Sequence, residues 1–273
     1  MTGTLAQLIA LTAFGNHYLK NGVVLTDFSS NNSTFQFCNK IDFVTFKKSF
    51  FSKNFKEKVI ANNPNAWFEY LKSEGCQHLR LYFESSASQS SAPDHKLAGF
   101  VGGGGSWLIE AIYDTYSNYW ANRWEVTEQE AADNRIWTVS YGLTASKQAI
   151  NNMQFDEEDL KEELRQTLIE IADFAYKKDL ENWGEMFDKS KEILDSSTPE
   201  ESYYHQDLIT FENYSCSAKQ LIFAASSAWV FGGMGSWNDL GFQNAEDNEM
   251  YDRLSGQLYS IINEAILAGV NSY

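Results

Sequence analysis

Apolar residues follow two different spacings along the chain, and the change falls near residue 150. After Asn151 and Asn152, leucine, isoleucine and alanine recur every three or four positions, which places them on one face of a helix. Acidic residues before the first of these runs and a proline after the second suit helix ends. The pattern predicts four helices, over residues 155–178, 180–194, 215–231 and from 245 or 247 to 268.

Between residues 78 and 145, large apolar residues alternate with polar ones, which is typical of strands with one solvent-exposed face. The connections between the later strands are short enough to join antiparallel neighbours. We therefore expect a β-meander built from residues 79–84, 107–113, 119–126 and 135–143.

The part of the chain that ends at Gly75 mixes both patterns. It predicts a helix over residues 4–20, a hairpin of strands 23–28 and 34–46, and a helix over 53–72 that is interrupted near Pro64. The fold class is therefore α+β, with an N-terminal helix plus an antiparallel β-meander sheet of five or six strands, followed by a mostly helical C-terminal half. We expect residues 1–150 to form the α+β region and residues 151–273 to form a helical region packed against it, or the two to form one continuous domain.

A rare motif, G-G-x-G-S-W, occurs at residues 102–107 and again at 232–237, each time after an apolar pair. Glycines permit positive φ or a close backbone approach, the serine can bond to the local backbone, and the tryptophan provides a large anchor. The motif predicts a sharp turn held by an indole. Because the first copy leads into a strand and the second follows a helix, two separate turns, or two walls of one site, explain the repeat better than an internal duplication.

Known catalytic and cofactor fingerprints do not fit these turns. A phosphate-binding P-loop needs Lys-Ser/Thr after its glycines, a dinucleotide-binding turn must open a helix after a strand, and a serine-hydrolase elbow needs a closing glycine. The three cysteines form no C-x-x-C arrangement, and the four histidines are far apart in the sequence. We therefore predict no metal and no cofactor.

Charge is distributed unevenly along the chain. The net formal charge is −16, and residues 101–273 hold 30 Asp+Glu against 11 Lys+Arg. A negative field of this kind repels nucleic acids and anionic membranes and attracts basic proteins. Because no apolar run is long enough to span a bilayer and no basic leader precedes the first apolar run, we expect a soluble cytoplasmic protein with no membrane contact.

The leading hypothesis is a non-catalytic acidic protein that binds and inhibits a basic protein partner, for example an immunity protein that neutralises a basic toxin or nuclease. Nucleic acid is an unfavoured partner, and the sequence predicts no oligomeric state. The acids expected to contact the partner are Asp239, Glu246, Asp247, Glu249, Asp252, Glu157, Glu158, Glu162 and Glu163.

Two alternatives remain open. The chain could be an enzyme that binds a small phosphorylated or nucleotide ligand between the glycine turns, or a structural subunit of a larger assembly, as its aromatic content allows. The enzyme hypothesis places the ligand at Gly102, Gly103, Gly105, Ser106, Trp107, Gly232, Gly233, Gly235, Ser236, Trp237, Asn238 and Asp239.

Overall fold

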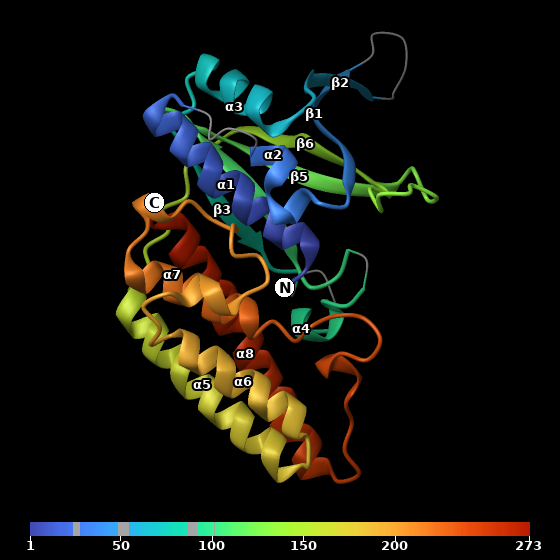
Figure 1. The fold of residues 1–273 in the computed structure, drawn as a ribbon, viewed down its shortest axis with the longest axis vertical. Coiled ribbons are helices and arrows are strands. Elements are labelled where there is room, and N and C mark those ends of the chain that lie inside the picture. The colour runs from blue at the N-terminus through green and yellow to red at the C-terminus, as the bar shows by residue number, and fades with distance from the viewer. Residues whose placement is uncertain (24–27, 49–54, 87–91, 101) are drawn as a thin grey trace.

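The computed structural model describes residues 1–23, 28–48, 55–86, 92–100 and 102–273. A six-stranded sheet carries helices on one face, and a bundle of four helices extends beyond one edge of the sheet (Figure 1). The strands are β1 (Cys38–Lys48), β2 (Phe55–Ala61), β3 (His78–Glu84), β4 (Ser106–Ile112), β5 (Ser117–Val126) and β6 (Trp137–Gln148). The helices of the sheet region are α1 (Gly3–Asn21), α2 (Phe28–Asn31), α3 (Pro64–Ser73) and α4 (Asp94–Leu97). The bundle consists of α5 (Glu157–Lys177), α6 (Glu181–Ile193), α7 (Cys216–Ser227) and α8 (Ala245–Asn271).

The α+β class is confirmed, but the sheet is mixed. Its strand order is β2-β1-β6-β5-β4-β3, and β3 to β6 form the expected antiparallel meander. The prediction of a purely antiparallel sheet is wrong because β1 lies parallel to β6, with Phe43 opposite Tyr141. Local alternation sets which face of a strand is buried and leaves the direction of its neighbour open, since that depends on how the chain returns to the sheet.

One prediction for the segment before Gly75 is wrong, and another lies mostly outside the described residues. Residues 55–61, expected in a helix, form β2, and the helix begins only at Pro64, where the Asn63 side chain caps the amide of Ala66. Proline at the first helical position marks a start, because its missing N–H has no partner there in any case. The expected strand 23–28 has residues 24–27 outside the described part of the chain, and Phe28 begins α2. Among the described residues, β1 pairs with β2 and β6.

The outer edge of β3 is closed by two asparagine side chains. Asn16 of α1 accepts a hydrogen bond from the Leu79 amide at 2.6 Å and donates to the Leu79 carbonyl at 2.8 Å. Asn271 of α8 does the same for Leu81, at 2.7 and 2.9 Å. Each amide therefore takes the place of a neighbouring strand, and the two bonded residues lie on the same edge because they are two positions apart.

The four predicted helices of the rear half are present, with ends within a few residues of the expected ones. Side chains cap three of them, since Asp156, Ser215 and Asn244 accept hydrogen bonds from backbone amides in the first turns of α5, α7 and α8. These local signals explain why the sequence pattern located the helices well.

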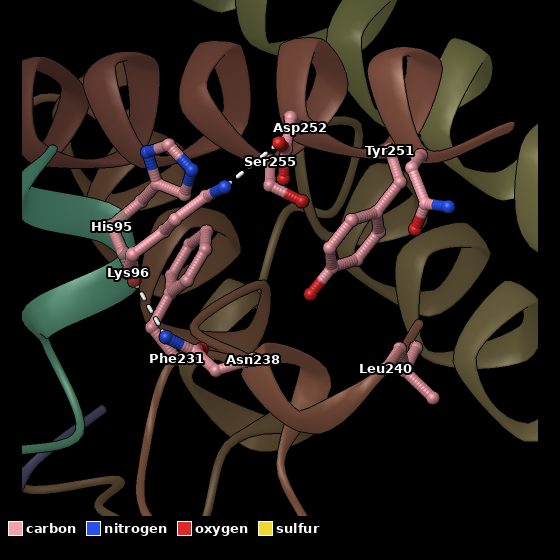
Figure 2. A pocket seen from close by; sticks show the side chains of 9 residues that line it. His95, Lys96, Phe231, Asn238, Leu240, Tyr251, Asp252 and Ser255 are labelled. Carbon is pink, nitrogen blue, oxygen red and sulfur yellow. Dashed lines mark hydrogen bonds and ion pairs between the residues drawn. The ribbon is translucent and has the colours of Figure 1, made fainter. Parts of the chain in front are cut away.

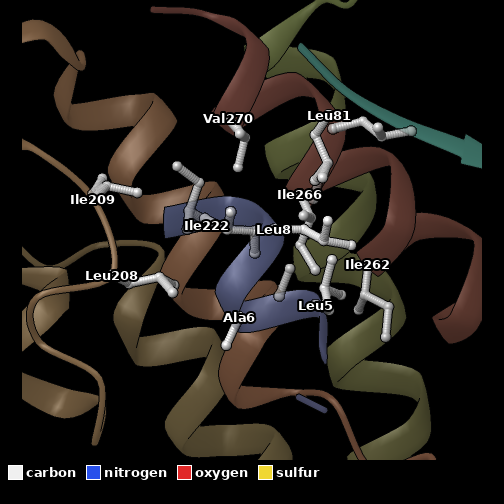
Figure 3. Packing of buried hydrophobic residues seen from close by; sticks show 14 of the residues in the cluster. Leu5, Ala6, Leu8, Leu81, Leu208, Ile209, Ile222, Ile262, Ile266 and Val270 are labelled. Carbon is white, nitrogen blue, oxygen red and sulfur yellow. The ribbon is translucent and has the colours of Figure 1, made fainter. Parts of the chain in front are cut away.

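One buried apolar cluster extends through both halves of the chain. Leu5 and Leu8 of α1 lie among Ile262 and Ile266 of α8, with Ile222 of α7 beside them (Figure 3). Helix α1 thus packs on the sheet and on the bundle at the same time. Across the described ranges, no helix combines the length and the apolar character needed to cross a membrane.

Candidate functional site: a cavity where the two glycine turns meet

The two glycine-rich segments lie against each other in the structure. A Cβ atom added to Gly99, just before the first turn, would lie only 1.9 Å from the carbonyl oxygen of Gly232, which opens the second turn. Asn238, just after the second turn, donates a hydrogen bond to the backbone carbonyl of His95 at 2.6 Å. The backbones of residues 95–99 and 232–238, far apart in the sequence, are therefore in direct contact.

Tyr259 of α8 connects the two segments from below. Its hydroxyl donates to the carbonyl of Gly104, and its ring packs edge-on against Phe231 with ring centres 5.0 Å apart. Burial raises the pKa of this phenol to about 12, so it remains a hydrogen-bond donor at neutral pH. Helix α8 thus fixes the position of both turns.

Glycine is required in the first turn by packing. A Cβ at Gly103 would lie 2.3 Å from the Leu97 carbonyl oxygen, and one at Gly105 would lie 2.5 Å from the Phe83 ring. Gly105 also has a φ of +80°, which other residues rarely adopt. Glycine therefore lets this turn pack closely against the segment that contains α4.

The second turn is held by its tryptophan, as the motif predicts. Trp237 is fully buried and its indole N–H donates to the Ser255 hydroxyl at 2.8 Å, while Tyr251 donates to the Trp237 carbonyl. The Ser236 hydroxyl bonds to the Gly232 carbonyl at 3.0 Å. These contacts make the turn a firm support for the residues on either side of it.

A cavity of about 260 Å³ opens where α4, the second turn and α8 meet (Figure 2). Rings and an aliphatic side chain form part of its wall, and polar side chains form the rest. The lining residues are His95, Lys96, Phe231, Asn238, Leu240, Asn248, Tyr251, Asp252 and Ser255.

Two polar atoms of the lining have no hydrogen-bond partner within the described residues, namely Oδ1 of Asn238 and Nε2 of His95. Burial and the neighbouring Lys96 ammonium lower the pKa of His95 below its ordinary value, so the imidazole is neutral at neutral pH. Both atoms are almost fully buried in the cavity wall, where a polar group usually has a partner, so each needs a small side-chain movement to reach a ligand in the cavity.

One ion pair lies at the cavity, between the Lys96 ammonium and the Asp252 carboxylate at 2.7 Å. The two side chains are 46% and 44% exposed, so the pair is easily exchanged for contacts with solvent or a ligand. The Ser255 and Tyr251 hydroxyls are engaged in holding Trp237. The arrangement therefore offers binding groups and has, among the described residues that line it, no hydroxyl bonded to a base that could act as a nucleophile.

The structure brings few of the sequence-predicted ligand residues to this cavity. Asn238 alone of that set lines it, while Asp252 comes from the set of expected partner-binding acids. Gly103 and Gly105 of the first turn are closely packed within the chain, and Asp239 accepts a hydrogen bond from the Gly235 amide. His95, Lys96 and Tyr251 were missed, because nothing in their local sequence shows that α4 and α8 meet.

The predicted partner-binding acids lie in two groups at opposite ends of α5. Glu158 lies near the start of α5. Lys178, the residue directly after the end of α5, forms an ion pair with Asp247 at 2.5 Å. Twenty residues of helix separate these points by about 30 Å, at 1.5 Å per residue. Glu157 and Glu158 accept hydrogen bonds from Ser215 and Ser217 of the α7 N-terminus.

Of the remaining acids, Glu162 forms an ion pair with Arg165 at 3.4 Å, and Glu163, Glu246 and Glu249 are exposed. The two groups of acids thus do not form one surface, and several members have partners within the chain. The group at the start of α8 is the one adjacent to the cavity.

Comparison of the chain with protein-family models, with curated proteins and with solved structures gave no match. Within the described residues, no three His, Cys, Asp or Glu side chains lie together in a way that could hold a metal ion.

Proposed function

We propose that the protein binds a basic protein partner without catalysing a reaction, and that the cavity receives one lysine or arginine side chain of that partner. The observation that supports this most directly is the Asp252 carboxylate, 44% exposed, in a cavity walled by the rings of Phe231 and Tyr251. An inhibitor that covers a basic surface, such as an immunity protein, works through contacts of this kind.

A cationic side chain matches each part of the cavity. Its charge would face Asp252, and its alkyl part would pack against the aromatic rings. Asn238 Oδ1 and His95 Nε2 are buried in the cavity wall, and a small turn of either side chain would let it accept an N–H of the cation. Lys96 forms an ion pair with Asp252 in this structure. Because the Lys96 side chain is partly exposed, its ammonium can turn to solvent when another cation binds to Asp252. The negative charge of residues 101–273 favours the approach of a basic partner.

The size of the cavity also favours a single side chain. Pockets for cofactors and drug-sized ligands hold about 300 to 1,000 Å³. A cavity of about 260 Å³ lies just below this range. A phosphorylated ligand would meet Lys96 as the one cation among the described lining residues, and the negative charge of residues 101–273 would oppose its approach.

The experiment is a titration of the isotope-labelled protein with agmatine, a guanidinium compound that imitates an arginine side chain, followed by NMR. We expect shifts in the side-chain amide of Asn238 and the imidazole of His95 at millimolar agmatine. Agmatine should bind Asp252→Asn more weakly than the native protein. Glu130→Gln removes an equal charge from an exposed position in the β5–β6 connection, and agmatine should bind it as it binds the native protein.

Parallel titrations with inorganic phosphate and ATP address the small-ligand alternative. Shifts at His95 and Asn238 with these anions but none with agmatine would reject the proposal and favour a phosphorylated ligand. Agmatine binding that falls equally in both charge variants would mean a general field effect, and would remove the cavity from the proposal.

A further inference from the structure

Two highly exposed apolar side chains lie on the two glycine segments, next to the contact between them. Met234, at the tip of the second turn, is 100% exposed, and Phe100, which follows Gly99, is 69% exposed. Gly99 packs on Gly232. Phe100 is one residue from Gly99 and Met234 is two residues from Gly232, and consecutive Cα atoms are about 3.8 Å apart. Both side chains therefore begin close to this contact. We call Phe100 and Met234 the anchor pair.

The backbone that carries the anchor pair is well supported. In the second turn the Ser236 amide bonds to the Gly233 carbonyl at 3.1 Å, the Gly235 amide bonds to Asp239, and Trp237 is buried beneath. In the first segment the Phe100 amide bonds to the Leu97 carbonyl at 2.9 Å. A turn that is already ordered loses little conformational entropy when a partner covers it, so its exposed side chains can contribute strongly to affinity.

We propose that the anchor pair is the apolar centre of the partner interface, and that it acts together with the cavity beside it. This inference rests on the proposed function and specifies the partner further. The partner is a folded basic protein with an apolar recess that receives Met234 and Phe100, and the lysine or arginine next to that recess enters the cavity.

Charge selects this occupant over other apolar partners. The exposed side chains of Asp239 and Glu249 lie in the segment and helix that adjoin the cavity, and the chain as a whole carries −16. A second copy of the chain would bring the same negative charge, and an anionic membrane would be repelled as well. A basic protein is attracted, and an aromatic ring and a methionine are common at the centres of protein interfaces.

The experiment introduces the photoreactive residue p-benzoylphenylalanine at position 234, and separately at position 100, in the full chain. The protein is irradiated in native lysate of the organism that produces it, and the adduct is mapped by mass spectrometry. We expect an adduct to one basic protein, on apolar residues that lie next to a lysine or arginine of its surface. The adduct should be lost when Asn238→Leu is combined with the photoreactive residue, because the cavity then no longer accepts the basic side chain.

Affinity for the identified partner then tests the contribution of each side chain. Met234→Ser and Phe100→Ser should each weaken binding about tenfold or more, as truncation of an interface anchor does. Val59→Thr is the matched control, because Val59 is an apolar side chain of β2 that is 50% exposed and lies at the far edge of the sheet. It should leave the affinity unchanged.

Other outcomes overturn the inference. No adduct, or an adduct only to a second copy of the chain, would reject the anchor pair as a partner surface while agmatine binding could still stand. An adduct to a partner that persists in Asn238→Leu would separate the pair from the cavity. If agmatine fails to bind but the adduct forms on a basic protein, the cavity assignment fails and the anchor pair remains.

Discussion

The contact between Gly99 and Gly232 allows a direct test of whether the two turns need each other. In Gly99→Ala the new methyl group would lie 1.9 Å from the Gly232 carbonyl oxygen, and Cβ atoms in real proteins essentially never come closer than 3.0 Å. The two segments must therefore move apart until this overlap is relieved. The movement strains the hydrogen bond from Asn238 to the His95 carbonyl, which joins the same segments at 2.6 Å.

We expect Gly99→Ala to lower the free energy of unfolding by about 2 to 3 kcal/mol, from overpacking and a weakened hydrogen bond. Urea unfolding followed by tryptophan fluorescence measures this loss, and agmatine binding should weaken because the cavity wall has moved. Gly233→Ala is the matched control, since no described residue lies within 4 Å of the added methyl group and the backbone does not have a positive φ. Its stability should be unchanged or higher by a few tenths of a kcal/mol. Equal stabilities of the two variants would refute the argument.

Three further changes test other parts of the structure. Burial lowers the pKa of His205 from 6.5 to about 4, so between these two pH values the unfolded chain binds a proton that the folded protein does not. The free energy of unfolding should therefore fall by about 2 to 3 kcal/mol as the pH is lowered over that interval. In His205→Asn, chemical unfolding at each pH should lack this contribution to the pH dependence. Asn271→Ala leaves the Leu81 amide and carbonyl at the β3 edge without these partners and should cost about 1 to 3 kcal/mol in urea unfolding. Trp237→Phe loses the bond to Ser255 and leaves a small cavity, and its thermal unfolding should show a loss of about 2 kcal/mol.

The bundle helices and the meander could be predicted because their signals are local. Caps at Asp156, Ser215 and Asn244 and the spacing of leucines determine where a helix lies, whatever it packs against. The mixed sheet could not be predicted in the same way, because β2 to β5 intervene in the chain between β1 and β6, and the direction of β1 depends on the whole path between them. The strand β2 was misread as helix, since the lysines and phenylalanines of residues 46–58 fit either period.

The candidate site was less accessible to sequence reasoning. The second copy of the repeated motif adjoins the cavity, and Trp237 holds its turn as expected. The lining, however, comes from three elements, and His95, Lys96 and Tyr251 carry no local pattern that brings them together. Only tertiary packing of α4 on α8 places their side chains around one cavity.

The two copies of the motif differ in why they contain glycine, and this difference favours a binding role for the second. In the first copy a side chain at Gly103 or Gly105 would collide with its neighbours, so packing explains them. In the second copy no described residue lies within 4 Å of a Cβ at Gly233 or Gly235, and Met234 between them is fully exposed. The φ of +83° explains glycine at position 235, but packing among the described residues does not explain the exposed Met234 at the tip of this turn. A partner that covers Met234 would bury this side chain, and a basic residue of the same partner would fill the cavity.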